Sequence, residues 1–383
     1  MKNFFLGSNI HFESELELEL REVWPYLIDL DGRPHAHPLV ILEQVPGGLL
    51  IEAPLHIGLQ LHFALKLANR ILLRLKEFRV RDFPKMFQQF SELKKNVFLK
   101  ALHLDFQISA KESRLNNEKR IQAILVDIFG EPHQTASQTL FVRMHDDLCT
   151  VSLDCTGTHL HKRSERQSQG VAPLRETLAA FCARSLIGES SPALLKNVTL
   201  LDPMCGAGSL LREACTLYQM TLREDFAFLE WNQTPKILKS SSLKGNYPKA
   251  PTLFKSIQGR DIDPEAILRA RENFLKISAP HEFWVRDLFV SGKKTEEKNA
   301  DTTWVICNPP YGERMKANFS PMQLLQQIEA EFRPHKVGIL FSESQALQLE
   351  NSLSAQESNL EIIDSKAFKN GGLAVRFVVL AQR

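Results

Sequence analysis

The stretch that most constrains the fold of this chain is a strand, a glycine turn and a helix that follow one another directly. Asn197-Val-Thr-Leu-Leu201 is an apolar run typical of a strand, Asp202-Pro-Met-Cys-Gly-Ala-Gly-Ser209 is rich in glycine, and Leu210 to Met220 has a helical pattern. In such a turn Gly206 and Gly208 allow close approach of the backbone, and the first N–H groups of the helix point at whatever lies there. The arrangement predicts an α/β domain that handles a nucleotide.

The spacing of the glycines separates two classes of ligand. A dinucleotide fingerprint needs a third glycine, and Leu211 stands at that position, which disfavours a nicotinamide cofactor. The pattern D-P-x-C-G-x-G-S instead resembles the S-adenosylmethionine loop of class I methyltransferases. A tight strand-to-helix turn without a ligand is the alternative. The resemblance implies S-adenosyl-L-methionine as the cofactor and the following cofactor-binding residues in the loop: Asp202, Pro203, Cys205, Gly206, Gly208 and Ser209.

Two further carboxylates are associated with predicted strands downstream. Asp261 follows the strand that begins at Ile257, and a carboxylate at that position can accept hydrogen bonds from both hydroxyls of a ribose. Asp263 is placed to cap the helix from Ala266 to Lys276. Phe283 to Phe289 is predicted to be a third strand, and the resemblance implies that Asp287 within it accepts from the adenine amino group.

The distance from the glycine turn to Asp261 indicates an inserted segment. A minimal unit separates these features by about 20 residues, so the much longer gap predicts an insertion from Arg223 to Thr252. The insertion resembles one found in ribosomal RNA methyltransferases. A plain excursion that covers the edge of the sheet is equally compatible with its sequence.

The tetrapeptide Asn308-Pro309-Pro310-Tyr311 follows the apolar run Trp304 to Cys307, which is predicted to be a buried parallel strand. Two consecutive prolines fix two φ angles and remove two N–H donors, so the loop is stiff and presents acceptors. The Asn308 side-chain oxygen and the Pro309 carbonyl can both accept from one exocyclic amine, and the Tyr311 ring offers a stacking face for a base. The pattern indicates modification of an amine on a nucleobase. The alternative is a strand that ends in a Pro-Pro turn with a half-buried tyrosine.

The last part of the chain completes the predicted fold. A helix from Pro321 to Phe332 and a strand from Lys336 to Phe341 precede two strands joined across Lys369-Asn-Gly-Gly372, which is a hairpin signal. Alternating strands and helices that end in a hairpin match the class I methyltransferase fold, an α/β fold with a Rossmann-like seven-stranded sheet.

The form of the proline loop points to one substrate class. Asn308-Pro-Pro-Tyr-Gly-Glu-Arg314 resembles the loop of THUMP-containing enzymes that methylate the guanine 2-amino group in 23S ribosomal RNA. This resemblance implies an RNA guanine-N2 methyltransferase with Asn308, Pro309, Pro310 and Tyr311 as catalytic residues and with Asn308 also near the cofactor. Adenine-N6 enzymes share the shorter Asn-Pro-Pro-Tyr, so adenine-N6 methylation of RNA or DNA stays open. A catalytically silent RNA-binding assembly factor is the third hypothesis.

The N-terminal half reverses its charge between neighbouring stretches. Residues 1 to 60 contain nine acidic and three basic side chains, whereas residues 66 to 120 contain fourteen Lys or Arg and six Asp or Glu. Leu61 to Lys76 repeats apolar residues at helical spacing with basic residues among them, which predicts a basic helix face. The excess favours contact with nucleic acid over a merely solvated face.

The order of elements from residue 103 to residue 154 carries a second resemblance. A strand at Leu104 to Ile108, a polar run at Ser109 to Leu115, a helix at Glu118 to Phe129 and two strand candidates ending at Asp154 resemble a THUMP domain, a small RNA-binding module. Residues 1 to 65 resemble the ferredoxin-like unit that accompanies it.

The linker extends the match toward THUMP-linked methyltransferases. Ala172-Pro-Leu-Arg-Glu-Thr-Leu-Ala-Ala180 resembles their helix after a basic connector, although Arg163-Ser-Glu-Arg166 stands where Gly and Tyr are usual. The predicted domains are therefore a ferredoxin-like α+β unit at 1–65, a THUMP domain at 66–158 and a methyltransferase domain at 159–383. The predicted RNA-binding residues are Lys66, Arg70, Arg74, Lys94, Lys95, Arg114, Arg163 and Arg166.

Cysteine usage and the N-terminus bear on metal binding and location. The six cysteines are scattered, without a C-x-x-C pair or zinc-type histidine spacing, which disfavours a metal site and a disulfide framework. The chain becomes polar soon after Met1 and has no apolar stretch of about 18 residues, so a cytoplasmic protein is predicted.

Overall fold

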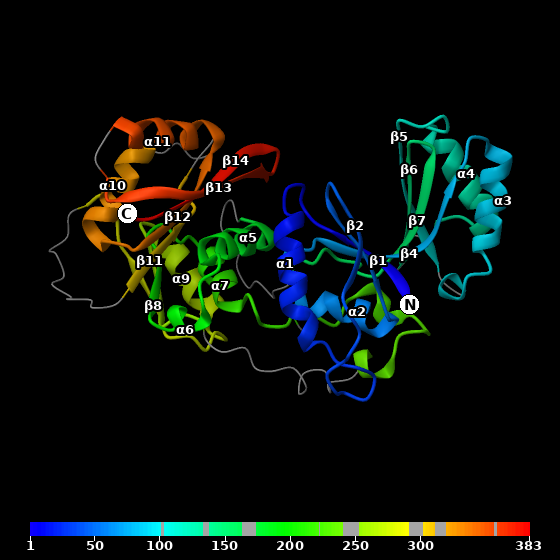
Figure 1. Ribbon diagram of the computed structural model, residues 1–383, viewed down its shortest axis with the longest axis horizontal. Coiled ribbons are helices and arrows are strands. Elements are labelled where there is room, and N and C mark those ends of the chain that lie inside the picture. Colours follow the sequence, from blue (N-terminus) through cyan, green and yellow to red (C-terminus); the bar gives the residue numbers. More distant parts are fainter. Residues whose placement is uncertain are drawn as a thin grey trace. The chain divides into compact units, whose positions relative to one another are not determined.

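The computed structural model in Figure 1 shows two compact units, formed by residues 1–163 with 220–248 and by residues 164–219 with 249–383. Among the residues described, no helix is long and apolar enough to cross a bilayer. The structure describes residues 1–100, 103–132, 138–162, 174–221, 223–239, 253–290, 302–310, 319–355 and 358–383.

The second unit is built on a seven-stranded sheet in the order β10-β9-β8-β11-β12-β14-β13. The first five of these strands run parallel, and β14 pairs antiparallel with both β12 and β13. The strand order reverses between β8 and β11, which is where doubly wound sheets bind their ligands. The prediction of an α/β fold with a Rossmann-like seven-stranded sheet is confirmed. The strands are β8 Val198–Asp202, β9 Ser256–Asp261, β10 His281–Val285, β11 Thr302–Cys307, β12 Lys336–Ser342, β13 Leu360–Asn370 and β14 Leu373–Gln382.

The core of this unit lies against the central strands β11 and β12. Val305, Ile339 and Phe341 are fully buried there together with Leu325 of the helix α10, as expected for parallel strands covered on both faces. The predicted hairpin is also confirmed, because β13 and β14 are joined at Gly371 and Gly372, which both have positive φ. The helices are α5 Glu176–Ile187, α6 Pro192–Leu195, α7 Ser209–Thr216, α9 Pro264–Phe274, α10 Pro321–Phe332 and α11 Glu343–Ala355.

The first unit contains its own seven-stranded sheet, in the order β2-β3-β1-β4-β7-β6-β5. β1 pairs with β4, so the sheet continues across the expected boundary between residues 65 and 66. A division of this unit into a ferredoxin-like part and a THUMP part therefore stays a prediction. The elements are β1 Lys2–Gly7, α1 Glu13–Val23, β2 Val40–Val45, β3 Gly48–Ala53, α2 Leu55–Ala64, β4 Arg70–Arg79, α3 Phe83–Leu93, β5 Leu104–Lys111, α4 Glu118–Phe129, β6 Gln138–His145 and β7 Leu148–Asp154, with short 3-10 turns at Trp24–Tyr26, Val97–Leu99, Ala227–Glu230 and Lys236–Lys239.

The predicted basic helix from Leu61 to Lys76 is wrong. The helix α2 ends at Ala64 and the strand β4 begins at Arg70. Ile71 and Leu73 are fully buried at alternate positions of β4, so the apolar spacing belongs to a strand. Apolar residues four apart share a face in both a helix and a strand, so a short run cannot separate the two.

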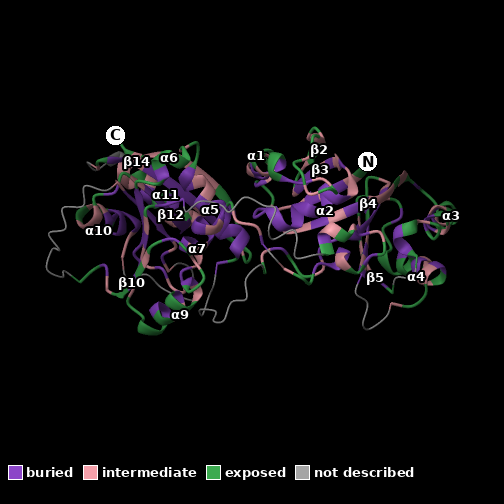
Figure 2. Ribbon diagram, turned by 90° about the horizontal axis from the view of Figure 1, so that it is seen from below, coloured by how far each residue is buried: buried purple, intermediate pink, exposed green. Residues whose placement is uncertain are grey.

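The segment after Gln219 belongs to the first unit. The Thr221 N–H donates to the Phe63 carbonyl at 2.7 Å, and Phe226 and Phe228 pack against His62 of α2. The helix α2 is thereby buried from residue 56 to residue 64, as the burial colours show (Figure 2). Phe226 and Phe228 of the predicted insertion thus belong to the core of the first unit.

Candidate active site at the carboxyl ends of the parallel strands

The predicted cofactor and catalytic residues leave four neighbouring strands at the same edge of the second sheet. Leu201 lies opposite Val305, so the glycine turn after β8 and the proline loop after β11 start side by side. Asp202 lies opposite Gly259, two residues before Asp261. The neighbouring β10 places Val285 opposite Asp261, two residues before Asp287. The structure therefore brings both loops and both acids to the carboxyl ends of adjacent strands.

The glycine turn has the left-handed backbone that its sequence predicts. Gly206 and Gly208 have φ of +53° and +78°. A Cβ on Gly208 would lie 3.1 Å from the Phe274 ring, whereas no heavy atom of the described residues lies within 4 Å of a Cβ built on Gly206. The turn is closed by the Gly208 N–H, which donates to the Cys205 carbonyl at 2.8 Å. Gly206 thus leaves room for a ligand, and Gly208 lets α7 begin close to α9.

The Asp261 carboxylate ties the glycine turn to the end of β9. One oxygen accepts from the Gly206 N–H at 2.8 Å and the other accepts from the Asp263 N–H at 3.0 Å. A carboxylate offers about four acceptor positions, so each oxygen can still accept one hydroxyl. Asp263 accepts from the Glu265 N–H at 2.9 Å, which confirms the prediction that it caps the next helix.

The Asp202 side chain is buried beneath the glycine turn and does not face the surface. It is only 1% exposed and accepts from the Met204 N–H at 3.0 Å. Burial raises the pKa of the Asp202 carboxyl well above its usual range, the Met204 N–H opposes this in part, and the charge of Asp261 raises the pKa further. Pro203 and Cys205 are buried beside it, and Ser209 is the first residue of α7.

The two thiols at this edge are held in the neutral form. Burial is the first cause that raises the pKa of Cys205 and of Cys307, and the carboxylates of Asp202 and Asp261 raise both further. A thiol needs to ionise to act as a nucleophile. Neither cysteine is therefore suited to covalent catalysis.

Asn308 presents an unused acceptor at the start of the proline loop. Its Oδ1 is buried, and no described residue donates a hydrogen bond to it. A buried acceptor without a donor costs about 1–3 kcal/mol, so this oxygen favours a ligand that carries an N–H or O–H group. Pro309 is buried and Pro310 is partly exposed, while Tyr311 lies outside the described residues.

Exposed apolar side chains flank the two acids, and sequence reasoning missed them. Ile262 is 67% exposed directly after Asp261, and Phe289 is 40% exposed two residues after Asp287. The Asp287 carboxylate accepts from the Phe289 N–H at 2.8 Å, so both belong to one turn. The signal that could have found them is an apolar residue within two positions of an acid at the end of a strand.

The predicted RNA-binding residues occupy different environments in the first unit. Lys94, Lys95 and Arg114 are exposed, whereas Arg70 and Arg74 are partly buried and pair with acids. The prediction for Lys66 is wrong, because its side chain is buried and its ammonium group donates to the Thr221 hydroxyl at 2.9 Å. Arg163 and Arg166 lie outside the described residues.

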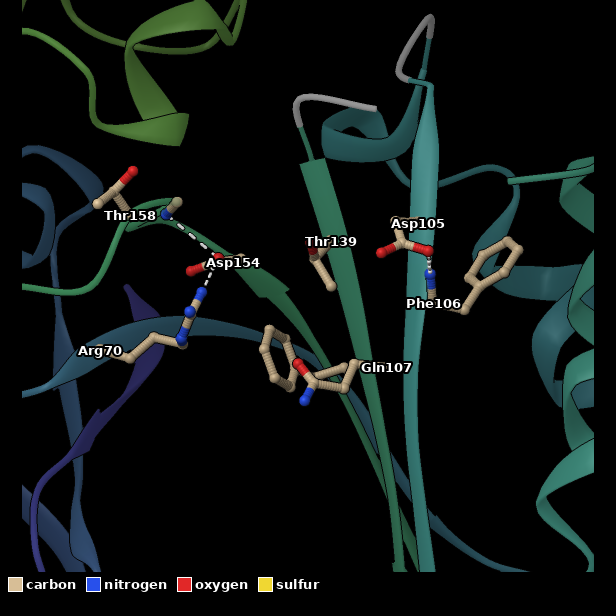
Figure 3. A pocket seen from close by; sticks show the side chains of 9 residues that line it. Arg70, Asp105, Phe106, Gln107, Thr139, Asp154 and Thr158 are labelled. Atoms are coloured by element: carbon tan, nitrogen blue, oxygen red, sulfur yellow. Dashed lines mark hydrogen bonds and ion pairs between the residues drawn. The ribbon is translucent and has the colours of Figure 1, made fainter. Parts of the chain in front are cut away.

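Arg70 lines a separate cavity of about 380 Å³ in the first unit. Figure 3 shows Arg70 pointing at Asp154, with which it forms an ion pair. The Arg70 guanidinium also lies 5.3 Å from the centre of the Phe141 ring. The cavity combines one cation with polar and aromatic walls. Its lining residues are Arg70, Asp105, Phe106, Gln107, Thr139, Phe141, Asp154, Gly157 and Thr158.

The fold and the site define a class I methyltransferase, the class that uses S-adenosyl-L-methionine as its methyl donor. The chain belongs to the family described as "RMKL-like, methyltransferase domain", which matches residues 163–372.

Known proteins resemble this chain over different shares of their length. The ribosomal RNA large subunit methyltransferase K/L of Psychromonas ingrahamii is 28% identical over 316 residues, which cover 76% of this chain and 41% of that protein. The protein of the same name from Desulfotalea psychrophila is 30% identical over 325 residues, which cover 78% of this chain and 44% of that protein. The chain thus spans less than half the length of these relatives. The structure of SMU.472 in complex with SAH covers 100% of this chain with a TM-score of 0.72 at 21% identity, which shows a shared fold.

Proposed function

We propose that this chain transfers a methyl group from S-adenosyl-L-methionine to the exocyclic amine of a base in RNA, the 2-amino group of a guanine in large-subunit ribosomal RNA. The observation that carries the proposal is the buried Oδ1 of Asn308, which no described residue satisfies, at the strand end next to the glycine turn. The names of the curated relatives support ribosomal RNA as the substrate. The SAH complex of SMU.472 supports the cofactor.

The residues at the edge of the sheet fit S-adenosyl-L-methionine. The free acceptor positions of Asp261 suit the two ribose hydroxyls, and Asp287 suits the adenine amino group. Ile262 and Phe289 would cover the faces of the adenine with apolar surface. The open side of Gly206 leaves room for the rest of the molecule. When bound, the cofactor supplies an electrophilic methyl group.

Asn308 and Pro309 would position the amine for attack. The lone pair of an aromatic amine is delocalised into its ring, so acceptors for the N–H groups favour a pyramidal nitrogen with its lone pair directed at the methyl group. The Asn308 Oδ1 and the Pro309 carbonyl are those acceptors. Alignment of this kind supplies most of the rate enhancement of a direct transfer, and no covalent intermediate on the neutral thiols is needed. Stacking of the base on Tyr311 stays a prediction.

The first unit would hold the RNA around the target base. A base leaves its helix at a cost of a few kcal/mol, which contacts to phosphates offset. The proposed contacts are Lys94, Lys95 and Arg114, together with Arg163 and Arg166 of the linker. We include in this proposal the division into a ferredoxin-like unit and a THUMP domain. Affinity for RNA should fall with rising salt, because each phosphate contact releases counterions.

The test is methylation of unmodified 23S ribosomal RNA by the full chain with labelled S-adenosyl-L-methionine, followed by digestion to nucleosides. N2-methylguanosine is the expected product. N6-methyladenosine would establish the alternative amine, and cofactor binding without any methylated nucleoside would contradict the assigned substrate. Absence of cofactor binding would identify a catalytically silent factor.

Asn308→Ala separates the mechanism from the cofactor site. We expect turnover to fall by more than about a hundredfold, since one aligned acceptor contributes about 3 kcal/mol to a transition state. Cofactor affinity, measured by calorimetry, should stay within about threefold. Asn351→Ala on the exposed side of α11 is the matched control and should leave both unchanged. Near-normal turnover in Asn308→Ala would refute the assigned role.

A further inference from the structure

We propose that the first unit binds a divalent transition-metal ion of the zinc type between Asp29, His37 and His56. One ligand atom from each of these three residues lies within 4.8 Å of the other two. Two imidazole nitrogens and one carboxylate oxygen are a donor set that zinc prefers. Three protein ligands also leave a position for water. The three ligands belong to the first unit, whereas the residues proposed for methyl transfer belong to the second.

The distances between the donor atoms are close to those of a bound ion. Asp29 Oδ1 lies 2.9 Å from His56 Nε2, and Asp29 Oδ2 lies 3.9 Å from His37 Nε2. Ligands at about 2.0–2.1 Å in a tetrahedron lie a little more than 3 Å apart, so small side-chain rotations suffice. His56 Nε2 is buried and makes no hydrogen bond of acceptable geometry with any described residue. His56 Nε2 is therefore close to the Asp29 carboxylate, but its geometry is not that of a hydrogen-bond donor to it.

The negative charge of Asp29 faces both histidines. It lies in a partly buried turn, and among the described residues its ion-pair partners are only the two histidines. The Leu30 N–H donates to Asp29 Oδ1 at 2.7 Å, which holds the carboxylate in place. A divalent ion would compensate the negative charge that Asp29 brings to the two imidazoles.

A buried glutamine holds two of the ligands in place. Gln60 of α2 donates to the Ile28 carbonyl at 2.7 Å and accepts from the Ile28 N–H at 3.0 Å. This bidentate contact fixes the residue before Asp29 to the helix that carries His56. Gln60 is fully buried, so the link is protected from water. Two of the three ligands are thus positioned by one side chain of the core.

The third ligand is fixed by its backbone. The His37 N–H donates to His35 Nδ1 at 3.1 Å, and its carbonyl accepts from the Trp24 indole at 2.9 Å. His35 Nδ1 must therefore be unprotonated, and its Nε2 lies 2.8 Å from the Trp24 carbonyl. This assigns the neutral tautomer with the proton on Nε2. His35 stacks on His37 with ring centres 5.8 Å apart, and it is a positioning residue and not a ligand.

The test uses the full chain, freed of any affinity tag and treated with a chelator, and titrates it with zinc chloride by calorimetry. One equivalent of zinc should bind, and cobalt should give the visible absorption of a site with imidazole ligands. Zinc should also raise the melting temperature of the native chain. His37→Ala and His56→Ala should each weaken zinc binding by at least about tenfold. His37 is partly exposed, so this variant tests the site even if the buried His56 is needed for folding.

His145→Ala is the matched control. His145 is exposed and lies 3.6 Å from Glu112, so it offers a histidine and a carboxylate with no third ligand among the residues that the structure describes. Zinc affinity should not change in this variant. Equal zinc affinity in the native chain, His37→Ala and His145→Ala would overturn the proposal and leave a metal-free histidine–aspartate contact. A native chain that binds no zinc would overturn it as well.

Discussion

Replacing Asp261 by asparagine should weaken the binding of S-adenosyl-L-methionine, and the contacts of its carboxylate give the magnitude. Both oxygens already accept from a backbone N–H, from Gly206 at 2.8 Å and from Asp263 at 3.0 Å. An asparagine keeps one acceptor oxygen and turns an NH2 group toward the other N–H. In either orientation one backbone donor faces another donor and, with the ribose bound as proposed, one hydroxyl would lose its acceptor.

The loss follows from the strength of these bonds. A hydrogen bond to a charged group contributes about 1.5–3 kcal/mol and a neutral one about 0.5–1.5 kcal/mol. Losing one charged bond to the ribose and weakening the other sums to about 2–4 kcal/mol, which is about a 30- to 700-fold rise in Kd. The orphaned N–H in the turn should also lower the free energy of unfolding by about 1–3 kcal/mol.

Calorimetry with S-adenosyl-L-methionine and urea unfolding measure the two effects separately. Asp263→Asn is the matched control, because asparagine caps a helix as well as aspartate does. That change removes only the contact of Asp263 with Arg269 at 3.2 Å, a surface pair that contributes about 0–1 kcal/mol. A Kd for Asp261→Asn within about threefold of the native value would refute the reasoning. An equal rise in Kd for Asp263→Asn would refute the reasoning as well.

Two further predictions concern stability. Gly208→Ala should lower the free energy of unfolding in urea by more than Gly371→Ala does. Both glycines have positive φ, which costs an alanine about 1–2 kcal/mol. Of the two, Gly208 alone would bring the new Cβ against a neighbour, the Phe274 ring at 3.1 Å. Equal losses would show that the Phe274 contact is unimportant. Burial lowers the pKa of His62 from its ordinary 6.5 to about 3, so the unfolded chain takes up a proton between these values and the folded chain does not. The contribution of neutral His62 to the free energy of unfolding is therefore fully present above about pH 6.5, and it falls toward pH 3 by up to about 1.4 kcal/mol per pH unit. Urea unfolding of His62→Phe should show a shallower pH dependence than that of the native chain. Parallel pH profiles would contradict a neutral buried His62.

The candidate site could be predicted from sequence because topology does most of the positioning. Asp202, Asp261 and Asn308 are far apart in the chain, but each lies at or directly after the end of a run that reads as a parallel strand. Crossovers between parallel strands have one hand, so consecutive strands of this kind bring their carboxyl ends to one edge. Reading the runs as strands was sufficient to place the residues together. No side-chain contact had to be known in advance.

The first unit was harder to read because its signals are short. Leu61 to Lys76 fits a helical period and a strand period, and only pairing with β1 and β7 decides between them. The burial of Lys66 follows from a contact with Thr221, which lies 155 positions later in the chain. The sequence indicates buried residues at Phe226, Phe228 and Trp231. It does not indicate which of the two hydrophobic cores contains them. Tertiary pairing settles each case, and a local pattern contains no information about it.

If zinc binds as proposed, the positions of the three ligands explain why residue spacing did not indicate the site. Asp29, His37 and His56 match no zinc spacing, and the sequence therefore disfavoured a metal site. Spacing rules describe ligands that one hairpin or one helix brings together, whereas these three come from a turn, a loop and the helix α2. What joins Asp29 to His56 is the bidentate contact between Gln60 and the backbone of Ile28. If that contact positions the site, Gln60→Leu should weaken zinc binding although Gln60 offers no ligand. Unchanged zinc affinity in a folded Gln60→Leu variant would show that the ligands find their places without it.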